Sequence, residues 1–409
     1  MARVRSIKSV LLLLAVQVFY SGLPLAANAS NACVDALSEL AAAQVSAPPA
    51  VSEVGLALAR QIDPRIRTLD ENALITKLED EAIRFLGEQG AVFQVMQMGG
   101  ERVIHFADAD PKHLLEAPLL NRFSTKLEMA YGAQVFFWAG ETVRTQSDGL
   151  AGSARNGNGV TVPVLYLGAN SLFSLAEPME DSVILHELRH IRMKLDAKRG
   201  IPSPYYGMVK ANKGVIPDRI NPRFLGYSEL LSFEEMLAFK AQAAIELIYL
   251  RAIVRRGGDA KDILAATQKV FSTIQYLYVV SHRSANAVEE LWAQLERDRA
   301  SATFLTENEV VTAVIPYVPS LSGKAGAAEL SYSIPIVSAK TSDRADLVKA
   351  LRVQVVDLGA AATFHEQQAR ALMIELDKYV QPDGPRIGVT EIDALTHLLA
   401  EDPPKKSKP

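Results

Sequence analysis

The residues best suited to chemistry lie in the stretch DSVILHELRHIRMKLD, residues 181–196, where two histidines stand four positions apart. Side chains four apart on a helix share one face, so the imidazoles of His186 and His190 can converge on a single ion. Glu187 directly follows the first histidine, and a carboxylate beside a metal can accept a proton. The apolar residues have the spacing of a half-buried helix: Val183, Ile184, Leu188, Ile191 and Leu195. The stretch is therefore typical of a helix that binds zinc.

The run from His186 to His190 is an HExxH motif, and in this it resembles the zincin metallopeptidases. The resemblance covers this helix and one downstream segment. It implies that His186 and His190 bind Zn²⁺ and that Glu187 is the general base, taking a proton from the water that the metal activates. Independently of the family, zinc with three protein ligands lowers the pKa of water in its fourth position toward neutrality. The motif determines the metal chemistry, whereas the choice between a peptide bond and another amide stays open.

The third zinc ligand has several candidates. Asp196 stands where the extended HExxHxxGxxH pattern has its last ligand, but Met193 replaces the glycine at which that pattern turns. IRMKLDAK can continue as helix, which would carry the aspartate away from the histidines. The gluzincin subgroup takes its ligand from a later helix, and the segment YSELLSFEEMLAFKAQ, residues 227–242, resembles that helix. This segment offers three acids: Glu229, Glu234 and Glu235.

Two adjacent glutamates of this segment are the main alternatives. The run from Glu235 to Ala238 resembles the E-x-x-A form of the gluzincin pattern, in which a small residue lets two helices approach, although Phe239 stands where an aspartate often follows. Ser232 and Glu235 also have the spacing of a capping box, which would turn the glutamate back onto the helix start. Glu234 lies on the apolar stripe that predicts the buried face. We expect Glu235 to be the ligand and keep Glu234 as the alternative.

The chain around this helix predicts a predominantly helical α+β protein. Helical spacing over residues 70–90 and the strand patterns AVFQVMQM, RVIHFA and AQVFFWA predict an N-terminal α+β region over residues 30–146. Whether this region is a propeptide stays open. Residues 257–400 predict a mainly helical C-terminal region, in which a long helix at 342–380 folds on itself near Gly359. These C-terminal helices could bind a partner protein.

Residues 147–256 are expected to form a zincin-like catalytic core. The core begins with SDGLAGSARNGNG, residues 147–159, whose Gly, Ser and Asn content predicts a mobile loop. VTVPVLYLG at 160–168 predicts a strand, and Pro163, which cannot donate to a ladder, predicts its place at the sheet edge. Such an antiparallel edge strand can pair with an extended substrate, and the resemblance to zincins implies that it lines the cleft. The core ends in a helix that is broken at Gly257.

The first 29 residues predict a secretory signal peptide. A basic start precedes the apolar run VLLLLAVQVFY, which is too short to span a bilayer, and a small-x-small cleavage pattern ends at Ala29. We therefore expect an exported protein, periplasmic or secreted, with no transmembrane helix in the mature chain. Cys33 is the only cysteine, so no intrachain disulfide can form. The residues before Cys33 lack the apolar residue of a lipid-attachment signal, which disfavours a lipid anchor.

The charge balance argues against one class of partner. The chain has 43 Lys and Arg against 47 Asp and Glu, a net charge of −4. Removing the three positive charges of the signal segment, which has no negative one, leaves −7. Nucleic-acid binding needs a concentrated basic surface, so the sequence predicts no nucleic-acid partner. The end of the chain, EDPPKKSKP at 401–409, predicts a disordered tail.

Several other residues are weaker candidates for the site. Hydrogen-bond donors for an oxyanion could come from Tyr205, Tyr206, Tyr227 or His282. Four further histidines have no partner at metal-binding spacing: His105, His113, His365 and His397.

The sequence thus predicts an exported zinc-dependent peptidase that acts on peptide or protein substrates. Zn²⁺ would be held by His186, His190 and Glu235, with Glu187 as the general base. The alternative is a non-catalytic exported protein with a structural or vestigial metal site and a helical partner-binding region. Retention of zinc without chelator-sensitive cleavage would distinguish this alternative from the enzyme.

Overall fold

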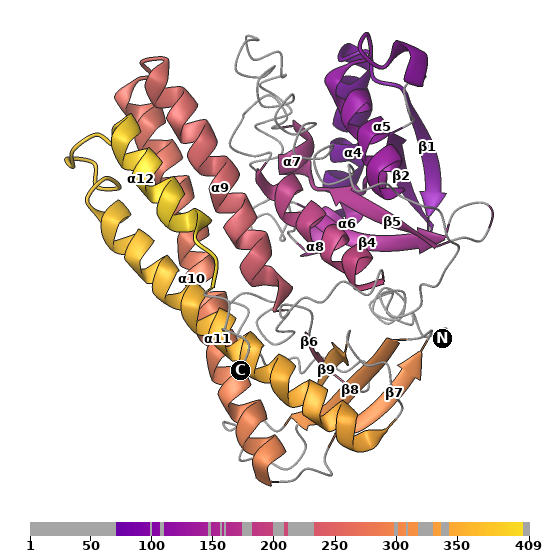
Figure 1. Ribbon diagram of the computed structural model, residues 1–409. Coiled ribbons are helices and arrows are strands. Elements are labelled where there is room, and N and C mark those ends of the chain that lie inside the picture. The colour runs from indigo at the N-terminus through magenta and orange to yellow at the C-terminus, as the bar shows by residue number, and fades with distance from the viewer. Residues whose placement is uncertain are drawn as a thin grey trace. The chain divides into compact units, whose positions relative to one another are not determined.

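The structure is a computed structural model in which not every residue is described. The described residues are 71–98, 100–106, 110–145, 149–155, 158, 161–173, 182–198, 208–211, 233–297, 302–307, 310–317, 330–336 and 343–403. The predicted signal peptide and Cys33 therefore lie outside them. The chain divides into two compact units, and the division falls inside one helix, between Ile191 and Arg192. The described residues form a predominantly helical α+β structure, as predicted, whereas the zincin-like core stays a prediction (Figure 1).

The N-terminal unit combines a five-stranded sheet with helices. In chain order its elements are α4 (Glu71–Glu88), β1 (Phe93–Met98), β2 (Glu101–Phe106), the short helix η2 (Pro111–His113), α5 (Leu119–Tyr131), β3 (Gln134–Phe137), α6 (Ala139–Thr145), β4 (Gly149–Arg155), β5 (Thr161–Leu167), α7 (Ala169–Phe173) and the greater part of α8 (Ser182–Lys198). Helix α4 and strands β1, β2 and β3 confirm the helix and the three strands predicted for this region.

The sheet has the strand order β1-β2-β3-β5-β4. Strands β3 and β5 run parallel, and the other neighbouring strands are antiparallel. Side chains alternate between the two faces of a strand, so Val103 and Ile104 of β2 point to opposite faces of the sheet. Val103 packs with Phe136, Trp138, Val164 and Tyr166. Helices α4 and α5 pack against β2, and α5 also packs against β3.

Strand β1 is an outer strand of this sheet, paired with β2 along its whole length. Its four central residues, Gln94 to Gln97, are exposed on both faces. Val95 is 47 % exposed and Met96 is 39 % exposed, although both are apolar. The strand carries no charged residue and no proline.

Two predictions about the start of the core are wrong. Residues 147–159 were expected to form a mobile loop, but Gly149–Arg155 is strand β4. The strand at 160–168 was expected at the sheet edge, but β5 lies between β3 and β4, so β4 and not β5 is the edge strand on this side of the sheet. Pro163 fits an inner strand because pairing with β3 begins only at Val164, so the missing N–H removes no bond from that ladder.

The C-terminal unit combines long helices with a second sheet. In chain order its elements, after the end of α8, are β6 (Met208–Ala211), α9 (Glu234–Arg255), α10 (Ala260–Arg297), β7 (Thr303–Glu307), β8 (Val310–Tyr317), β9 (Leu330–Ile336), α11 (Arg344–Asp377) and α12 (Val389–Ala400). Helix α10 packs against both α9 and α11, while α12 packs against α9 and α11 (Figure 1). The antiparallel sheet has the order β6-β9-β8-β7, and β9 packs on α11.

Two glycines of this unit act in different ways. Gly257 follows the end of α9 with φ +70°, a left-handed conformation that favours glycine, so the chain turns there as predicted. Gly359 was expected to mark a fold in the helix at 342–380, but α11 is continuous through it. A Cβ at Gly359 would lie 2.8 Å from Val288 Cγ1 of α10, so this glycine permits close packing of two helices rather than a turn.

Helix α12 is held at its C-terminal end by side chains of two other helices. Gln368 of α11 donates from Nε2 to the carbonyl oxygens of Leu398, at 2.7 Å, and Glu401, at 3.1 Å. Lys240 of α9 donates to the same Glu401 carbonyl at 2.5 Å. These donors satisfy acceptors that a helix end leaves without intrahelical partners. Arg251 of α9 also forms an ion pair with Asp393 of α12.

Candidate metal centre

Helix α8 presents the HExxH motif from a half-buried position. Ile184, Leu188 and Ile191 are buried as predicted, and Val183 is half-buried, while the side chain of Leu195 lies outside the described residues. His186 is 8 % exposed and His190 is 7 % exposed. Their ring centroids lie 5.2 Å apart with an interplanar angle of 62°. The four-residue spacing therefore places two imidazoles side by side and largely shielded from water.

Glu187 is bound by the backbone of strand β4. Its Oε2 accepts a hydrogen bond of 2.7 Å from the Ala151 backbone N–H. Strand β4 also comes close to the helix at Gly149, where an added Cβ would lie 3.0 Å from Glu187 Cγ and 3.1 Å from Val183 Cγ1. The sequence interpretation missed this contact because it assigned these residues to a loop. The signal that could have found it is the high content of small residues in GLAGSA, which permits close approach to a strand.

Helix α9 begins with the two candidate acidic ligands. It starts at Glu234 with Phe233 at its N-cap and no side-chain capping bond. Glu235 is thus the second helical residue, one position short of the place that the capping box requires. Ser232 lies outside the described residues. Glu234 is 2 % exposed, as its place on the apolar stripe predicted, whereas Glu235 is half-buried.

Within the described part of the chain, three side chains could hold one metal ion: His186, His190 and Glu235. Each offers one ligand atom, and these atoms all lie within 4.8 Å of one another. The group includes Glu235 and not Glu234. Asp196 lies on α8, but its side chain is outside the described residues, as is the whole of Glu229.

The donor set of this group fits zinc. Two imidazole nitrogens and one carboxylate oxygen are a ligand set of catalytic zinc sites, in which protein atoms bind at about 2 Å and leave a fourth position for water or substrate. Calcium and magnesium prefer sets made of oxygen atoms. Glu187 lies on the same helix, directly after the first of the two histidines. The group therefore offers three donor atoms to which one divalent metal ion could bind.

Phe239 packs against another aromatic ring, and its side chain has no polar atom that could hydrogen-bond to a metal ligand. It stands where the gluzincin pattern often has an aspartate, and its ring stacks on Tyr276 of α10 with centroids 5.5 Å apart. Zinc-binding histidines usually donate their second ring nitrogen to a carboxylate, carbonyl or water. In this chain such a partner must come from a residue other than 239.

The other sequence candidates lie away from this group or outside the described residues. His282 was a candidate oxyanion donor; it lies on α10 with its Nδ1 3.1 Å from Glu366 Oε1 and its Nε2 3.3 Å from Asn286 Nδ2. The three tyrosine candidates, Tyr205, Tyr206 and Tyr227, lie outside the described residues.

The remaining histidines have roles within the fold. His105 stacks on Phe136 with centroids 4.8 Å apart. His113 pairs with Glu116 at the surface. His365 is fully buried, and burial lowers its pKa to about 4. His397 lies in the last turn of α12. In the described residues, none of these belongs to a metal-binding group of three.

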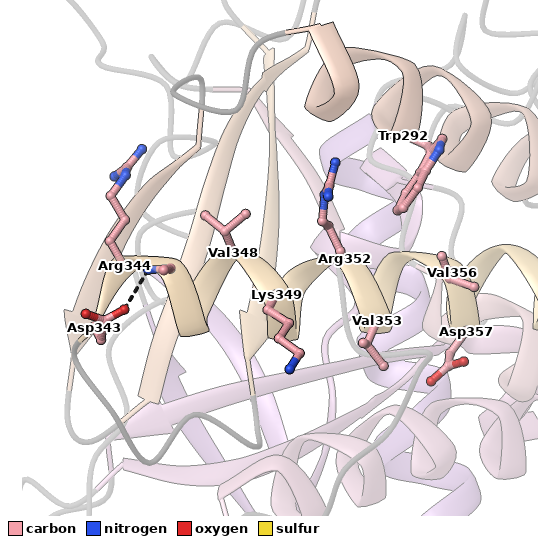
Figure 2. A pocket seen from close by; sticks show the side chains of 10 residues that line it. Trp292, Asp343, Arg344, Val348, Lys349, Arg352, Val353, Val356 and Asp357 are labelled. Carbon is pink, nitrogen blue, oxygen red and sulfur yellow. Dashed lines mark hydrogen bonds between the residues drawn. The ribbon is translucent and has the colours of Figure 1, made fainter. Parts of the chain in front are cut away.

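A pocket of about 1000 Å³ lies on the C-terminal unit, along α11 and beside α10 (Figure 2). Its apolar lining includes Val353, which is 57 % exposed, and Val356, which is 38 % exposed. Arg352 lies over the ring of Trp292 at 5.6 Å. Charges of both signs line the pocket, including Lys349 and Asp357.

No helix of the described residues combines the length and the apolar character needed to cross a membrane. Comparison with known proteins gives no relative: no family model, no curated protein and no solved structure matches the chain.

Proposed function

We propose that the chain is an exported zinc-dependent metallopeptidase, periplasmic or secreted. The observation that carries the proposal is the group of His186, His190 and Glu235, whose ligand atoms lie within 4.8 Å of one another. The second support is the position of Glu187 on the same helix. Together they supply the metal ligands and the proton acceptor that hydrolysis of an amide bond requires.

Each residue has a separate task in the proposed reaction. His186 and His190 bind through neutral ring nitrogens, and Glu235 contributes an anionic oxygen. When bound, zinc supplies Lewis-acid polarisation of the scissile carbonyl and a water of lowered pKa. Glu187 accepts a proton from the attacking water and returns it to the leaving amine. Because Oε2 of Glu187 accepts from Ala151, Oε1 is the oxygen that takes this proton.

Strand β4 is the proposed contact for an extended peptide substrate. It is one of the two edge strands of the N-terminal sheet and lies beside α8, as the bond between Ala151 and Glu187 indicates. An edge strand offers backbone groups with which an added strand can pair. The sequence assigned pairing with an extended substrate to residues 160–168. In this proposal the strand that pairs with the substrate is Gly149–Arg155.

The decisive experiment compares cleavage and zinc content in one set of variants. The purified chain should bind one zinc per molecule by elemental analysis and cleave a peptide library in a chelator-sensitive way. Glu187→Gln should keep the zinc and lose cleavage by about 100-fold or more, because the amide cannot accept the proton. Arg189→Gln, a change within the motif outside the proposed ligand and base positions, is the matched control and should retain both properties. Full turnover by Glu187→Gln would refute the role of the general base.

The non-catalytic alternative is supported by the exposed apolar lining of the pocket on α11, which suits a partner protein. The same experiment separates the two functions. Zinc binding without cleavage of any library peptide would favour a structural metal site. Absence of zinc would leave the helical surface as the main candidate for function.

A further inference from the structure

Strand β4 is placed against the HExxH helix by a glycine. A Cβ at Gly149 would lie 3.0 Å from Glu187 Cγ and 3.1 Å from Val183 Cγ1, and real Cβ contacts are almost never shorter than 3.0 Å. An added Cβ would require the side chains of Glu187 and Val183 to give way by a few tenths of an ångström. The absence of a side chain at Gly149 therefore favours the close approach of β4 to α8.

This close approach brings a backbone donor to the carboxylate of Glu187. The bond from the Ala151 N–H to Glu187 Oε2 is 2.7 Å, within the range of a hydrogen bond to a charged acceptor. Ala151 lies two residues after Gly149, on the same side of the strand. Because the donor belongs to the backbone of a sheet, its position is fixed, and it restricts rotation of the carboxylate about its last torsion.

We infer that Gly149 and the Ala151 N–H orient the general base, which makes Gly149 a positioning residue for the proposed hydrolysis. The inference rests on the proposed function and adds a requirement on β4 that the HExxH motif does not contain. With Oε2 held by Ala151, Oε1 is directed to the attacking water. General-base catalysis is sensitive to such placement, because a shift of about 1 Å can cost about 100-fold in rate.

The test compares two glycines of the same strand. Gly152 faces the other side of β4, where an added Cβ would lie 3.3 Å from Tyr166 Cε2. Gly149→Ala should lower kcat by about 10- to 100-fold with KM changed less than about twofold, since orientation and not binding is lost. Gly152→Ala should keep kcat within about threefold, because it does not contact Glu187. Both variants should bind zinc as the unmodified chain does.

Hydrogen exchange at the Ala151 amide gives a readout that needs no activity. The amide should be protected in the unmodified chain and in Gly152→Ala, and less protected in Gly149→Ala and Glu187→Ala. Glu187→Gln keeps an acceptor oxygen and should keep part of the protection. If Gly149→Ala does not fold, Ala151→Pro removes the donor directly at a position where an edge strand tolerates proline. The same loss of kcat is expected.

The outcomes separate the two hypotheses. Chelator-sensitive cleavage that survives Gly149→Ala and Ala151→Pro unchanged would overturn the positioning role alone. An Ala151 amide that exchanges equally fast in the unmodified chain and in Glu187→Ala would also overturn it. Absence of cleavage by the unmodified chain would overturn the proposed function and the positioning role together.

Discussion

Glu234 and Glu235 are neighbours in the first turn of α9, yet only Glu235 belongs to the group with His186 and His190. Consecutive residues on a helix point about 100° apart, so the two carboxylates leave the helix in different directions. Glu234 is 2 % exposed and faces the packed side. A choice of ligand based on burial alone would therefore name Glu234, which does not belong to this group.

This difference predicts which glutamate binds zinc. Glu235→Gln should weaken zinc binding by more than about 100-fold, because the change removes an anionic ligand. Losing a ligand lowers the zinc affinity more than losing a residue that only supports a ligand. Glu234→Gln is the matched control, with the same change one position earlier, and should retain the metal. Competition with a chromogenic chelator measures both affinities. Loss of zinc only in the Glu234 variant would reverse the assignment.

His365 should make the stability of the C-terminal unit depend on pH. Burial lowers its pKa from 6.5 to about 4, and it contacts Gln368 Oε1 at 3.1 Å, with Lys240 and Asp402 nearby. The folded state then binds fewer protons than the unfolded state between these pH values, so the free energy of unfolding falls as pH is lowered from about 6.5 to about 4. The shift corresponds to about 3 kcal/mol.

Urea unfolding of His365→Leu from pH 7 to pH 4 measures this dependence. The variant should be less stable than the unmodified chain at pH 7 by about 1 kcal/mol, because Gln368 loses a hydrogen bond. At pH 4 the difference should vanish or reverse, because leucine takes up no proton. Parallel curves for the two proteins across this range would contradict the assignment.

The ion pair between Arg251 and Asp393 should stabilise the docking of α12. Arg251 Nε lies 2.5 Å and Nη2 lies 3.0 Å from the two carboxylate oxygens. The hydrogen bond from Arg251 lowers the pKa of Asp393 below its ordinary 3.8. The stabilisation is therefore present above pH 3.8 and is lost as pH falls through the lowered pKa.

Asp393→Asn should show a small decrease in the urea midpoint at pH 7, because partly exposed pairs contribute little. The difference from the unmodified chain should disappear in strong acid and shrink in high salt. A difference that persists at a pH well below 3 would show that the asparagine disturbs packing rather than charge. Lys378→Met, at the exposed pair with Glu375, serves as a control that leaves α12 docking unchanged.

Replacing Gly359 by any larger residue should destabilise the protein, although this glycine lies inside a helix. Gly359→Ala places a methyl group 2.8 Å from Val288 Cγ1, and overpacking of this kind costs about 1–3 kcal/mol. Gly87→Ala in α4 is the matched control, since nothing lies within 4 Å of the added Cβ. It should raise stability by about 0.5–1 kcal/mol through the higher helix propensity of alanine. Equal effects of the two substitutions on thermal unfolding would refute this account.

The sequence was most informative where a pattern is local. The spacing of apolar residues in α8 and the turn at Gly257 depend on neighbours within a few positions, and the structure contains both. The four-residue separation of His186 and His190 likewise needs only a helix to bring the rings together.

The wrong predictions all concern contacts between distant segments. Glycine was interpreted as a sign of flexibility at 149 and of a turn at 359, whereas at both positions it permits close packing against another element. Pro163 was interpreted as a sign of an edge strand. The inner strand β5 tolerates this proline because β3 pairs with β5 only from Val164 onward. A single sequence records which residues are small and does not record what approaches them.

Strand β1 has a consequence for handling the protein. Natural outer strands discourage pairing with other molecules through charges, prolines or bulges, and FQVMQM has neither charge nor proline. Heating or concentrating the chain should therefore favour intermolecular β-sheet that grows from this strand, and a lysine at Val95 should delay the resulting turbidity.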